Sequence, residues 1–358
     1  MKPRLVLVSH VDWGHVRQRP HHLAAGLAAR YDVTVIAPLA RKRSSLVTQP
    51  ARGARVVHVL RVPGSYRSAV VARLNATVAR WQCAPRIRAA AAVVVTSPEL
   101  WPWIAPDVGR RPLVYDCMDD ALAFDQDAGV RDLKARWERE LIARADVTVC
   151  SSDELAARMR SRGAPAERLR VIPNGWDPEA FPVQPSQALP AAGPLVLAYF
   201  GTIARWLDTD ALRAVVAACP GASIRLIGPV DGAAPTAIER VATEPPWPHD
   251  ALAAAVADAN AMLLPFRVGD LTRAVDPVKL YEYVALGKPV AASYWPALDR
   301  FAPFVTFYRD PAHLATLVRE RALPAPPDAA ARTAFLAPQS WRSRAEALAD
   351  AIEATRGH

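Results

Sequence analysis

Residues 4–38, RLVLVSHVDWGHVRQRPHHLAAGLAARYDVTVIAP, indicate the fold class, because a helical segment lies between two short apolar runs. The runs at 5–8 and 33–36 are brief and continuously apolar, which is typical of strands buried on both faces of a parallel sheet. The segment between them, PHHLAAGLAAR, opens with Pro20, a residue suited to the first turn of a helix. A strand, a helix and a strand in this order predict a parallel βαβ unit.

The same alternation continues along the chain and pauses once. Between residues 183 and 194, prolines and small residues leave no helical period, which is typical of a linker. We therefore predict an α/β protein with two Rossmann-like, doubly wound domains facing each other across a cleft, one at 1–182 and one at 195–337. The closing amphipathic segment 338–358 is expected to form a helix that packs back onto the first domain.

The composition narrows the class of protein but does not identify its binding partner. The chain has 358 residues, enough for two domains, and a formal charge of +9 that would suit an anionic ligand. No run approaches the ~20 apolar residues that a membrane-spanning helix needs, so we expect a soluble protein. The four cysteines are far apart and form no C-x-x-C pair, which argues against a disulfide framework or zinc site and fits a reducing cytoplasm.

The best-known phosphate-binding motifs are absent. Neither domain's first strand is followed by G-x-G-x-x-G, and the chain has no G-x-x-x-x-G-K-[ST]. The histidines of the first loop have no matching carboxylate or cysteine spacing. We therefore expect no cofactor, no metal and, because the basic residues are dispersed, no nucleic acid partner.

The stretch DPVKLYEYVALGKPV, residues 276–290, predicts a short helix capped by Asp276. Its free N–H groups would favour an anion, and Lys279 and Glu282 fall on one helical face. A lysine can meet a diphosphate, and a carboxylate can accept hydrogen bonds from two ribose hydroxyls, so the pair matches a nucleotide. An ordinary surface ion pair with the same spacing is the alternative.

Six motifs carry a resemblance to a known family: RQRPHHLAAGLA, VYDCMDD, VIPNGWD, YFGTIARWLD, LLPF and PVKLYEYVALGKPV. In this order they resemble the GT-B glycosyltransferases, especially the group 1 (GT4-like) bacterial enzymes that build surface polysaccharides. The resemblance covers nearly the whole chain. It implies a nucleotide-sugar donor held by the C-terminal domain, an acceptor held by the N-terminal domain, no metal requirement, and Glu282 as the glutamate that binds ribose.

Two departures from the family pattern bear on the donor. Many group 1 enzymes carry a second glutamate eight positions before the ribose-binding one, where this chain has Ala274. The donor sugar and a retaining mechanism are therefore left open. After YFG the family often has an arginine and a lysine for the diphosphate, whereas here Thr202 follows and Arg205 is the nearest cation. Lys279 and Arg267 are the candidates to replace them.

The segment LVYDCMDD, residues 113–120, also resembles a loop of the xanthan glucuronosyltransferase, an inverting GT-B enzyme. Matching VY places that enzyme's catalytic aspartate on Asp119. An inverting transfer needs one carboxylate to take the proton of the acceptor hydroxyl while the leaving diphosphate is stabilised. Asp119 and Lys279 are the candidates for these two roles. The alternative is that the acidic cluster of Asp116, Asp119 and Asp120 caps a helix or turn.

The first loop supplies the candidate acceptor or cleft residues, which are His10, Asp12, Trp13, Arg17 and Arg19. Cations are disfavoured at a helix N-terminus, so the two arginines before Pro20 indicate a compensating anion. That anion is either a substrate phosphate or the carboxylate of Asp12. Trp13 and Trp247 are candidates for stacking on a sugar of the acceptor and the donor respectively, and ordinary packing is the alternative.

A basic, amphipathic stretch from about residue 66 to 91, preceded by RKR at 41–43, would suit anionic lipid headgroups or be a solvated helix face. We therefore expect a cytoplasmic protein that acts at the inner face of the plasma membrane when its acceptor is polyprenyl-linked. The predicted function is transfer of a hexosyl unit from a nucleoside diphosphate sugar to a glycan or lipid-linked oligosaccharide. A non-catalytic glycan-binding or partner subunit and a nucleotide-sugar epimerase are the alternatives.

Overall fold

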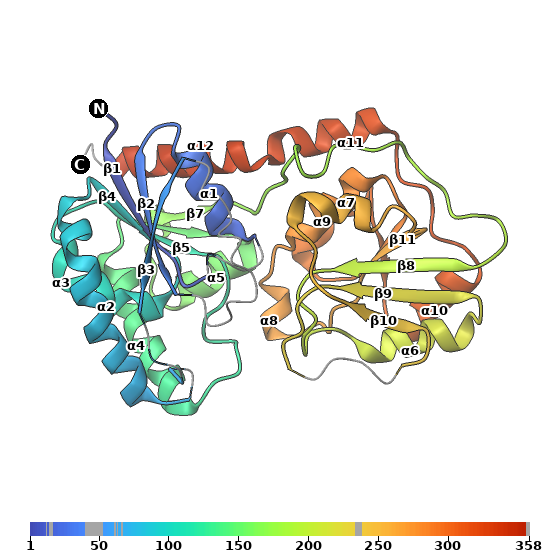
Figure 1. Cartoon of the computed structure of the whole chain (residues 1–358), viewed down its shortest axis with the longest axis horizontal. Coiled ribbons are helices and arrows are strands. Elements are labelled where there is room, and N and C mark those ends of the chain that lie inside the picture. Colours follow the sequence, from blue (N-terminus) through green and yellow to red (C-terminus); the bar gives the residue numbers. More distant parts are fainter. Residues whose placement is uncertain are drawn as a thin grey trace. The chain divides into compact units, whose positions relative to one another are not determined.

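The chain divides into two compact units, which are Met1–Asn174 with Trp341–His358 (unit 1) and Gly175–Ser340 (unit 2). Each unit of this computed structural model contains one parallel sheet with helices packed on it (Figure 1). The predicted α/β class with two Rossmann-like, doubly wound sheets is confirmed. The residues that the structure describes are 1–11, 13, 17–39, 53–60, 62, 64–65, 67–232 and 238–355.

The sheet of unit 1 has the order β3-β2-β1-β4-β5-β6-β7, so the direction of winding reverses at β1. Its strands are β1 (Arg4–Val8), β2 (Asp32–Pro38), β3 (Arg55–Val59), β4 (Ala92–Val95), β5 (Leu113–Cys117), β6 (Val147–Cys150) and β7 (Leu169–Val171). The central strands are almost fully buried, as their continuous apolar runs predict.

The helices of unit 1 are α1 (Arg19–Leu27), α2 (Ala69–Ala89), α3 (Trp101–Val108), α4 (Ala128–Arg144), α5 (Asp153–Ser161) and α12 (Trp341–Ala354), with 3₁₀ turns at Pro98–Leu100 and Ala166–Arg168. Helices α2, α3 and α4 contact one another (Figure 1). Helix α12 packs along α1, where His22 stacks on Trp341 with ring centroids 4.6 Å apart. A side chain at Gly26 would overlap Ala345, so this glycine permits the close approach of the two helices.

The sheet of unit 2 has the order β10-β9-β8-β11-β12-β13 and reverses its winding at β8. Its strands are β8 (Leu195–Phe200), β9 (Ala222–Ile227), β10 (Val241–Glu244), β11 (Ala261–Leu264), β12 (Val290–Ser293) and β13 (Thr306–Tyr308). Its helices are α6 (Thr209–Ala218), α7 (Leu252–Ala255), α8 (Asp270–Arg273), α9 (Val278–Leu286), α10 (Pro311–Arg319) and α11 (Ala329–Leu336), with 3₁₀ turns at His249–Ala251, Pro296–Phe301 and Ala337–Gln339.

The segment before β8 belongs to unit 2. Trp176 and Phe181 lie in the hydrophobic core of that unit, and Trp176 Nε1 donates to the carbonyl of Phe181 over 2.8 Å. The first domain predicted at 1–182 therefore extends past the observed division, because these two aromatic side chains pack against the second sheet. The backbone N–H of Gln184 donates to the carbonyl of Ala285 over 2.8 Å, which ties the predicted linker 183–194 to the end of α9.

Helix α9 ends at Gly287, whose φ of 67° is left-handed. A side chain there would overlap the carbonyl of Pro185, so only glycine fits both the turn and the packed segment beside it. Among the described residues, no helix has the length and apolar character needed to cross a membrane.

Candidate functional site

Helix α9 begins one residue later than its sequence predicts. Pro277 is the N-cap residue and its side chain makes no capping hydrogen bond. The carboxylate of Asp276, predicted to be the cap, instead accepts from the hydroxyl of Tyr281 over 3.0 Å and pairs with Arg300. A buried carboxylate needs such partners, so Asp276 anchors the loop that leads into the helix.

Lys279 lies in the first turn of α9. Its side chain lies near β8, the strand at which the sheet of unit 2 reverses its winding. Its Nζ is 5.5 Å from the ring centroid of Tyr199 on β8 and 5.9 Å from that of Phe266, which follows β11. In open parallel sheets, ligands bind at the carboxyl ends of the strands beside such a reversal. Lys279 therefore places a positive charge where this fold binds its ligands.

Glycines make room for that lysine. A side chain at Gly201, directly after β8, would overlap the end of Lys279, and the φ of Gly201 is 127°, which side chains rarely adopt. A side chain at Gly228, directly after β9, would overlap the carbonyl of Gly201. The glycines at the ends of two adjacent strands thus allow Lys279 and the backbone of Gly201 to pack closely against them.

Glu282 lies one turn further along α9 and is 4% exposed. Its Oε1 is 2.8 Å from Nε2 of His249, which begins the 3₁₀ turn after β10. His249 is also packed edge-on against Phe181, with ring centroids 5.2 Å apart. The surface ion pair considered for Lys279 and Glu282 is absent from the interactions of the described residues, where Glu282 pairs with His249.

The remaining donor candidates lie in unit 2 in different surroundings. Thr202 accepts through its carbonyl from the hydroxyl of Tyr199 over 2.8 Å, and burial keeps that phenol neutral by raising its pKa. Arg267 is about half exposed and donates to Thr209 Oγ1 over 3.2 Å, so it lies beside the start of α6. Arg205 is exposed in the loop after β8.

Trp247 is exposed, and it precedes His249 by two positions. An exposed indole is available for stacking on a ring. The role of Trp247 in binding the donor stays a prediction.

In unit 1, Arg19 is buried and satisfied by internal partners. Its Nη2 is 2.7 Å from Oδ1 of Asp116, and its Nε donates to both oxygens of the same carboxylate over 3.0 Å. Its Nη1 donates to the carbonyl of Ile172 and to Oδ1 of Asn174. The compensating anion is therefore Asp116 of β5, and Arg19 joins the start of α1 to β5 and to the segment after β7.

The other first-loop candidates differ in exposure. Trp13 is 2% exposed and stacks on His21 with ring centroids 4.1 Å apart, so packing rather than sugar stacking describes its position. His10 Nδ1 is 2.9 Å from Thr96 Oγ1, which holds it beside the end of β4. Arg17 is half-buried. Asp12 and the RKR at 41–43 lie outside the described residues.

The two aspartates after β5 have different environments. Asp120 is buried, pairs with Arg158 over 3.0 Å and with Arg162 over 2.7 Å, and accepts from the backbone N–H of Leu122. Burial would raise the pKa of Asp120, but the hydrogen bonds and charges of the two arginines lower it. Asp119 is half-buried, which leaves its carboxylate the more accessible of the two.

Arg162, which pairs with Asp120, also pairs with Glu138 of α4. The Oε2 atom of Glu138 is 2.9 Å from Nη1 of Arg162. Glu138 also accepts from the hydroxyl of Tyr115 over 2.9 Å, and burial raises the pKa of Glu138. This buried network stabilises the loop after β5, and Asp120 makes a turn contact of the kind considered for the acidic cluster, by accepting from the backbone N–H of Leu122.

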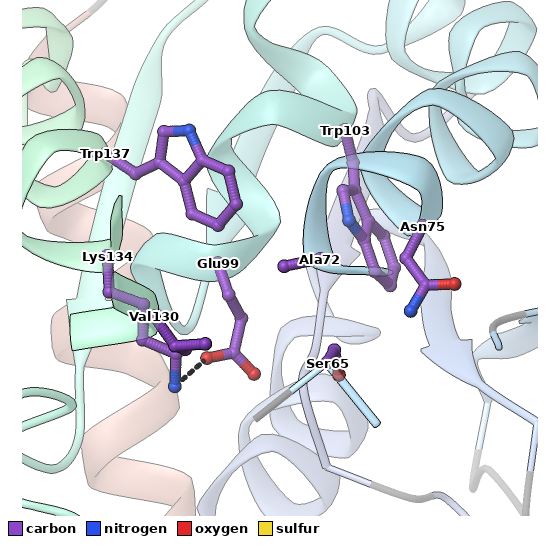
Figure 2. Close-up of a pocket in the computed structure, with 8 residues that line it drawn as sticks. All are labelled: Ser65, Ala72, Asn75, Glu99, Trp103, Val130, Lys134 and Trp137. Atoms are coloured by element: carbon purple, nitrogen blue, oxygen red, sulfur yellow. Dashed lines mark ion pairs between the residues drawn. The ribbon is translucent and has the colours of Figure 1, made fainter. Parts of the chain in front are cut away.

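Unit 1 also has a small pocket between α2, α3 and α4 (Figure 2). Trp103 and Trp137 are among its lining residues, and the ammonium of Lys134 is 2.7 Å from the carboxylate of Glu99 (Figure 2). Its cavity volume of about 30 Å³ would hold roughly one or two water molecules, too little for a sugar ring. Among the described residues, no group of three or more His, Cys, Asp or Glu side chains could hold a metal ion.

Comparison with known proteins shows what the N-terminal part of the chain is similar to. Residues 14–175 match the family model described as a glycosyl transferase 4-like domain. This match shows that the N-terminal part of the chain is similar to that domain family. The predicted resemblance of the chain to group 1 glycosyltransferases of the GT-B fold is confirmed.

A curated relative of the chain is the putative teichuronic acid biosynthesis glycosyltransferase TuaH of Bacillus subtilis, which is 25% identical over 221 residues. The match covers 56% of this chain and 55% of TuaH, so the chain spans about half the length of that relative.

Two solved structures resemble the whole chain. The sucrose-phosphate synthase of Thermosynechococcus elongatus has a TM-score of 0.74 and 17% identity, over 99% of this chain and 100% of that one. HepE of Anabaena, in complex with UDP and glucose, has a TM-score of 0.70 and 15% identity, over 98% of this chain and 99% of its own. At such low identity these similarities establish the fold.

Outside residues 14–175, the predictions from the sequence missed His249 and Tyr199. His249 lies in EPPWPHD, residues 244–250, where prolines hide any regular period. Its pairing with Glu282 joins positions 33 residues apart, which no local pattern records. Tyr199 lies inside an apolar strand and has no sequence signal of its own.

Proposed function

We propose that the chain is a glycosyltransferase that moves a hexosyl unit from a nucleoside diphosphate sugar to a glycan or a lipid-linked oligosaccharide of a bacterial surface polysaccharide. The observation that carries this proposal is the position of Lys279 and Glu282 on α9, with Lys279 over the glycine-rich strand ends of unit 2. The ammonium would meet the diphosphate, and the carboxylate would accept hydrogen bonds from the ribose hydroxyls.

The relatives support this choice of substrate. TuaH is named as a glycosyltransferase of teichuronic acid biosynthesis, and HepE was crystallised with UDP and glucose. UDP-sugars are therefore the first donors to test. The identity of the base and sugar follows from that test.

We further propose that the reaction is independent of metal and inverts the anomeric centre. Lys279 supplies the positive charge that stabilises the leaving diphosphate, and Asp119 takes the proton of the acceptor hydroxyl. The replacement of the family's second glutamate by Ala274 supports inversion, because that glutamate usually contacts the donor sugar in retaining enzymes. The buried, doubly paired Asp120 is not available for this role.

The test begins with thermal shifts against a panel of nucleotides and nucleotide sugars, because a ligand that binds the folded state raises its stability. The best donor, radiolabelled in the sugar, is then incubated with a membrane extract and with EDTA. Label entering the glycan or lipid fraction in EDTA is the expected result. Binding without transfer would identify a non-catalytic subunit, and conversion of the free donor sugar would identify an epimerase.

A further inference from the structure

Helix α2 exposes a continuous apolar stripe. Val70, Leu74, Val78 and Trp81 are 73%, 50%, 40% and 86% exposed. Their spacing of four, four and three positions places them on one face of the helix. The opposite face, which includes Ala79 and Cys83, is buried against unit 1. The stripe is therefore additional to the apolar surface that holds α2 in place.

The charges around the stripe are of one sign. Helix α2 has 21 residues with the sequence AVVARLNATVARWQCAPRIRA, which contains four arginines and no acidic residue. Two of them, Arg80 and Arg88, pair with Asp107. Within the described part of the chain, no carboxylate pairs with Arg73 or Arg86. At 100° per residue, Arg73 lies on one side of the stripe and Arg86 on the other.

The apolar stripe together with the arginines beside it indicates which kind of partner could cover α2. Nucleic acid would use the arginines but leave the aliphatic side chains and Trp81 unburied. A second copy packed about a two-fold axis would bring the arginines of two α2 helices together without an acidic residue on either. An anionic bilayer takes both features, since headgroups attract arginine and the interface accommodates tryptophan and aliphatic side chains.

We propose that the α2 stripe docks unit 1 onto an anionic lipid bilayer, with Val70, Leu74, Val78 and Trp81 entering the interface and Arg73 and Arg86 contacting headgroup phosphates. This surface deepens the proposed function, because it would bring the protein to a lipid-linked acceptor. It does not depend on donor chemistry, so it is tested on the protein without nucleotide sugar. Vesicle binding can then fail while transfer succeeds, and the reverse.

The experiment measures cosedimentation of the full chain with vesicles of phosphatidylcholine alone or containing about 30% phosphatidylglycerol. We expect binding to the anionic vesicles that weakens as salt is raised. Leu74→Ser with Trp81→Ser should lower the partition coefficient at least about tenfold, because two interfacial anchors are lost. Arg73→Gln with Arg86→Gln should lower it roughly tenfold to thirtyfold at low salt.

Two control variants remove exposed apolar or charged side chains that lie outside α2. Val171→Ser with Tyr294→Ser removes two other exposed apolar side chains, and Arg319→Gln with Arg342→Gln removes two other exposed charges. Both controls should bind vesicles as the unmodified protein does. Circular dichroism and melting temperature establish that each variant is folded.

Three results would overturn the proposal. They are no binding of the unmodified protein to anionic vesicles, binding that the α2 variants do not weaken, and equal losses in the controls. Light scattering without lipid adds a separate outcome. If Leu74→Ser with Trp81→Ser converts a dimer to a monomer while vesicle binding is unchanged, the stripe is a self-association surface instead.

Discussion

His249 Nε2 lies 2.8 Å from Oε1 of Glu282 and joins the turn after β10 to the middle of α9. An ionised carboxylate has no proton to give, so the imidazole is the donor. A carboxylate offers about four lone-pair positions, enough to accept from His249 and from ribose hydroxyls together. The pairing therefore orients Glu282 without using up its capacity to bind a ligand.

Glu282→Ala should weaken UDP binding by about 1–3 kcal/mol, because the ribose hydroxyls would be desolvated without a partner. Titration calorimetry of UDP with each protein measures the change. Glu239→Ala, which alters an exposed glutamate of the same unit, is the control and should bind normally. A folded Glu282 variant with unchanged affinity would remove the ribose assignment.

His249→Leu should weaken UDP binding less than loss of Glu282 does, by roughly 1 kcal/mol, because the carboxylate remains but is no longer held by a hydrogen bond. His249→Gln keeps a donor and should restore part of the affinity. The same calorimetry compares the three proteins. If the Gln variant is no better than the Leu variant, the hydrogen bond of His249 does not position Glu282.

Gly201→Ala should impair UDP binding, because its new methyl group would occupy the space of the Lys279 side chain. Gly232→Ala is a matched control, since Gly232 also has a positive φ of 90° but nothing within 4 Å of its absent side chain. Both variants should lose stability through backbone strain. Only the first should lose UDP affinity, and equal losses of affinity would refute the close packing of Lys279 on the strand end.

Asp119→Asn should lower turnover by roughly 10²–10⁴ while donor affinity survives, because the amide cannot accept the proton. Asp125→Asn changes an exposed carboxylate nearby in sequence and should leave turnover within about twofold. Proton NMR of the product reads the anomeric configuration, which should be opposite to that of the donor. Retention, together with an active Asp119 variant, would reject the inverting mechanism.

Asp120→Ala should destabilise the fold by roughly 1–3 kcal/mol at neutral pH, since Arg158 and Arg162 each lose one carboxylate partner and keep Glu154 and Glu138 respectively. The pKa of Asp120 is lowered in the folded protein, so its stabilisation is present above about pH 4 and is lost as pH falls through that lowered value.

Urea unfolding at several pH values should therefore show a gap between the unmodified protein and the Asp120 variant that narrows only in acid. Asp132→Ala, at an exposed position of α4, should show almost no gap at any pH. A gap of constant size from pH 7 to below 4 would mean that the charge of Asp120 does not matter.

The sequence predicted most of both sheets, because the central strands are continuous apolar runs whose burial leaves few alternatives. Strand β10 does not follow this pattern, since VATE lies at the sheet edge, is partly exposed and has no apolar run. Pro277 rather than Asp276 proved to be the N-cap of α9, because the buried carboxylate of Asp276 pairs with Arg300, 24 positions away in sequence.

The site residues could likewise be predicted where the signal is local in sequence, and not where it depends on a contact between distant segments. Lys279 and Glu282 could be predicted because one helix fixes their spacing, whereas the partner of each comes from another element. Arg19 appeared to need an anion and does have one, but the anion is Asp116, 97 positions away. Local spacing indicates which side chains carry chemistry, and tertiary packing determines whether they meet a ligand or one another.

The packing of α12 on α1 has a consequence for how the chain is made. A ribosome delivers the first strands and helices of unit 1 early, yet the helix that covers α1 emerges only after residues 175–340. During synthesis the face of α1 around Gly26 and His22 stays uncovered, so unit 1 would need protection from aggregation until residues 341–354 have been made. Unit 2, whose residues are contiguous, can finish folding first.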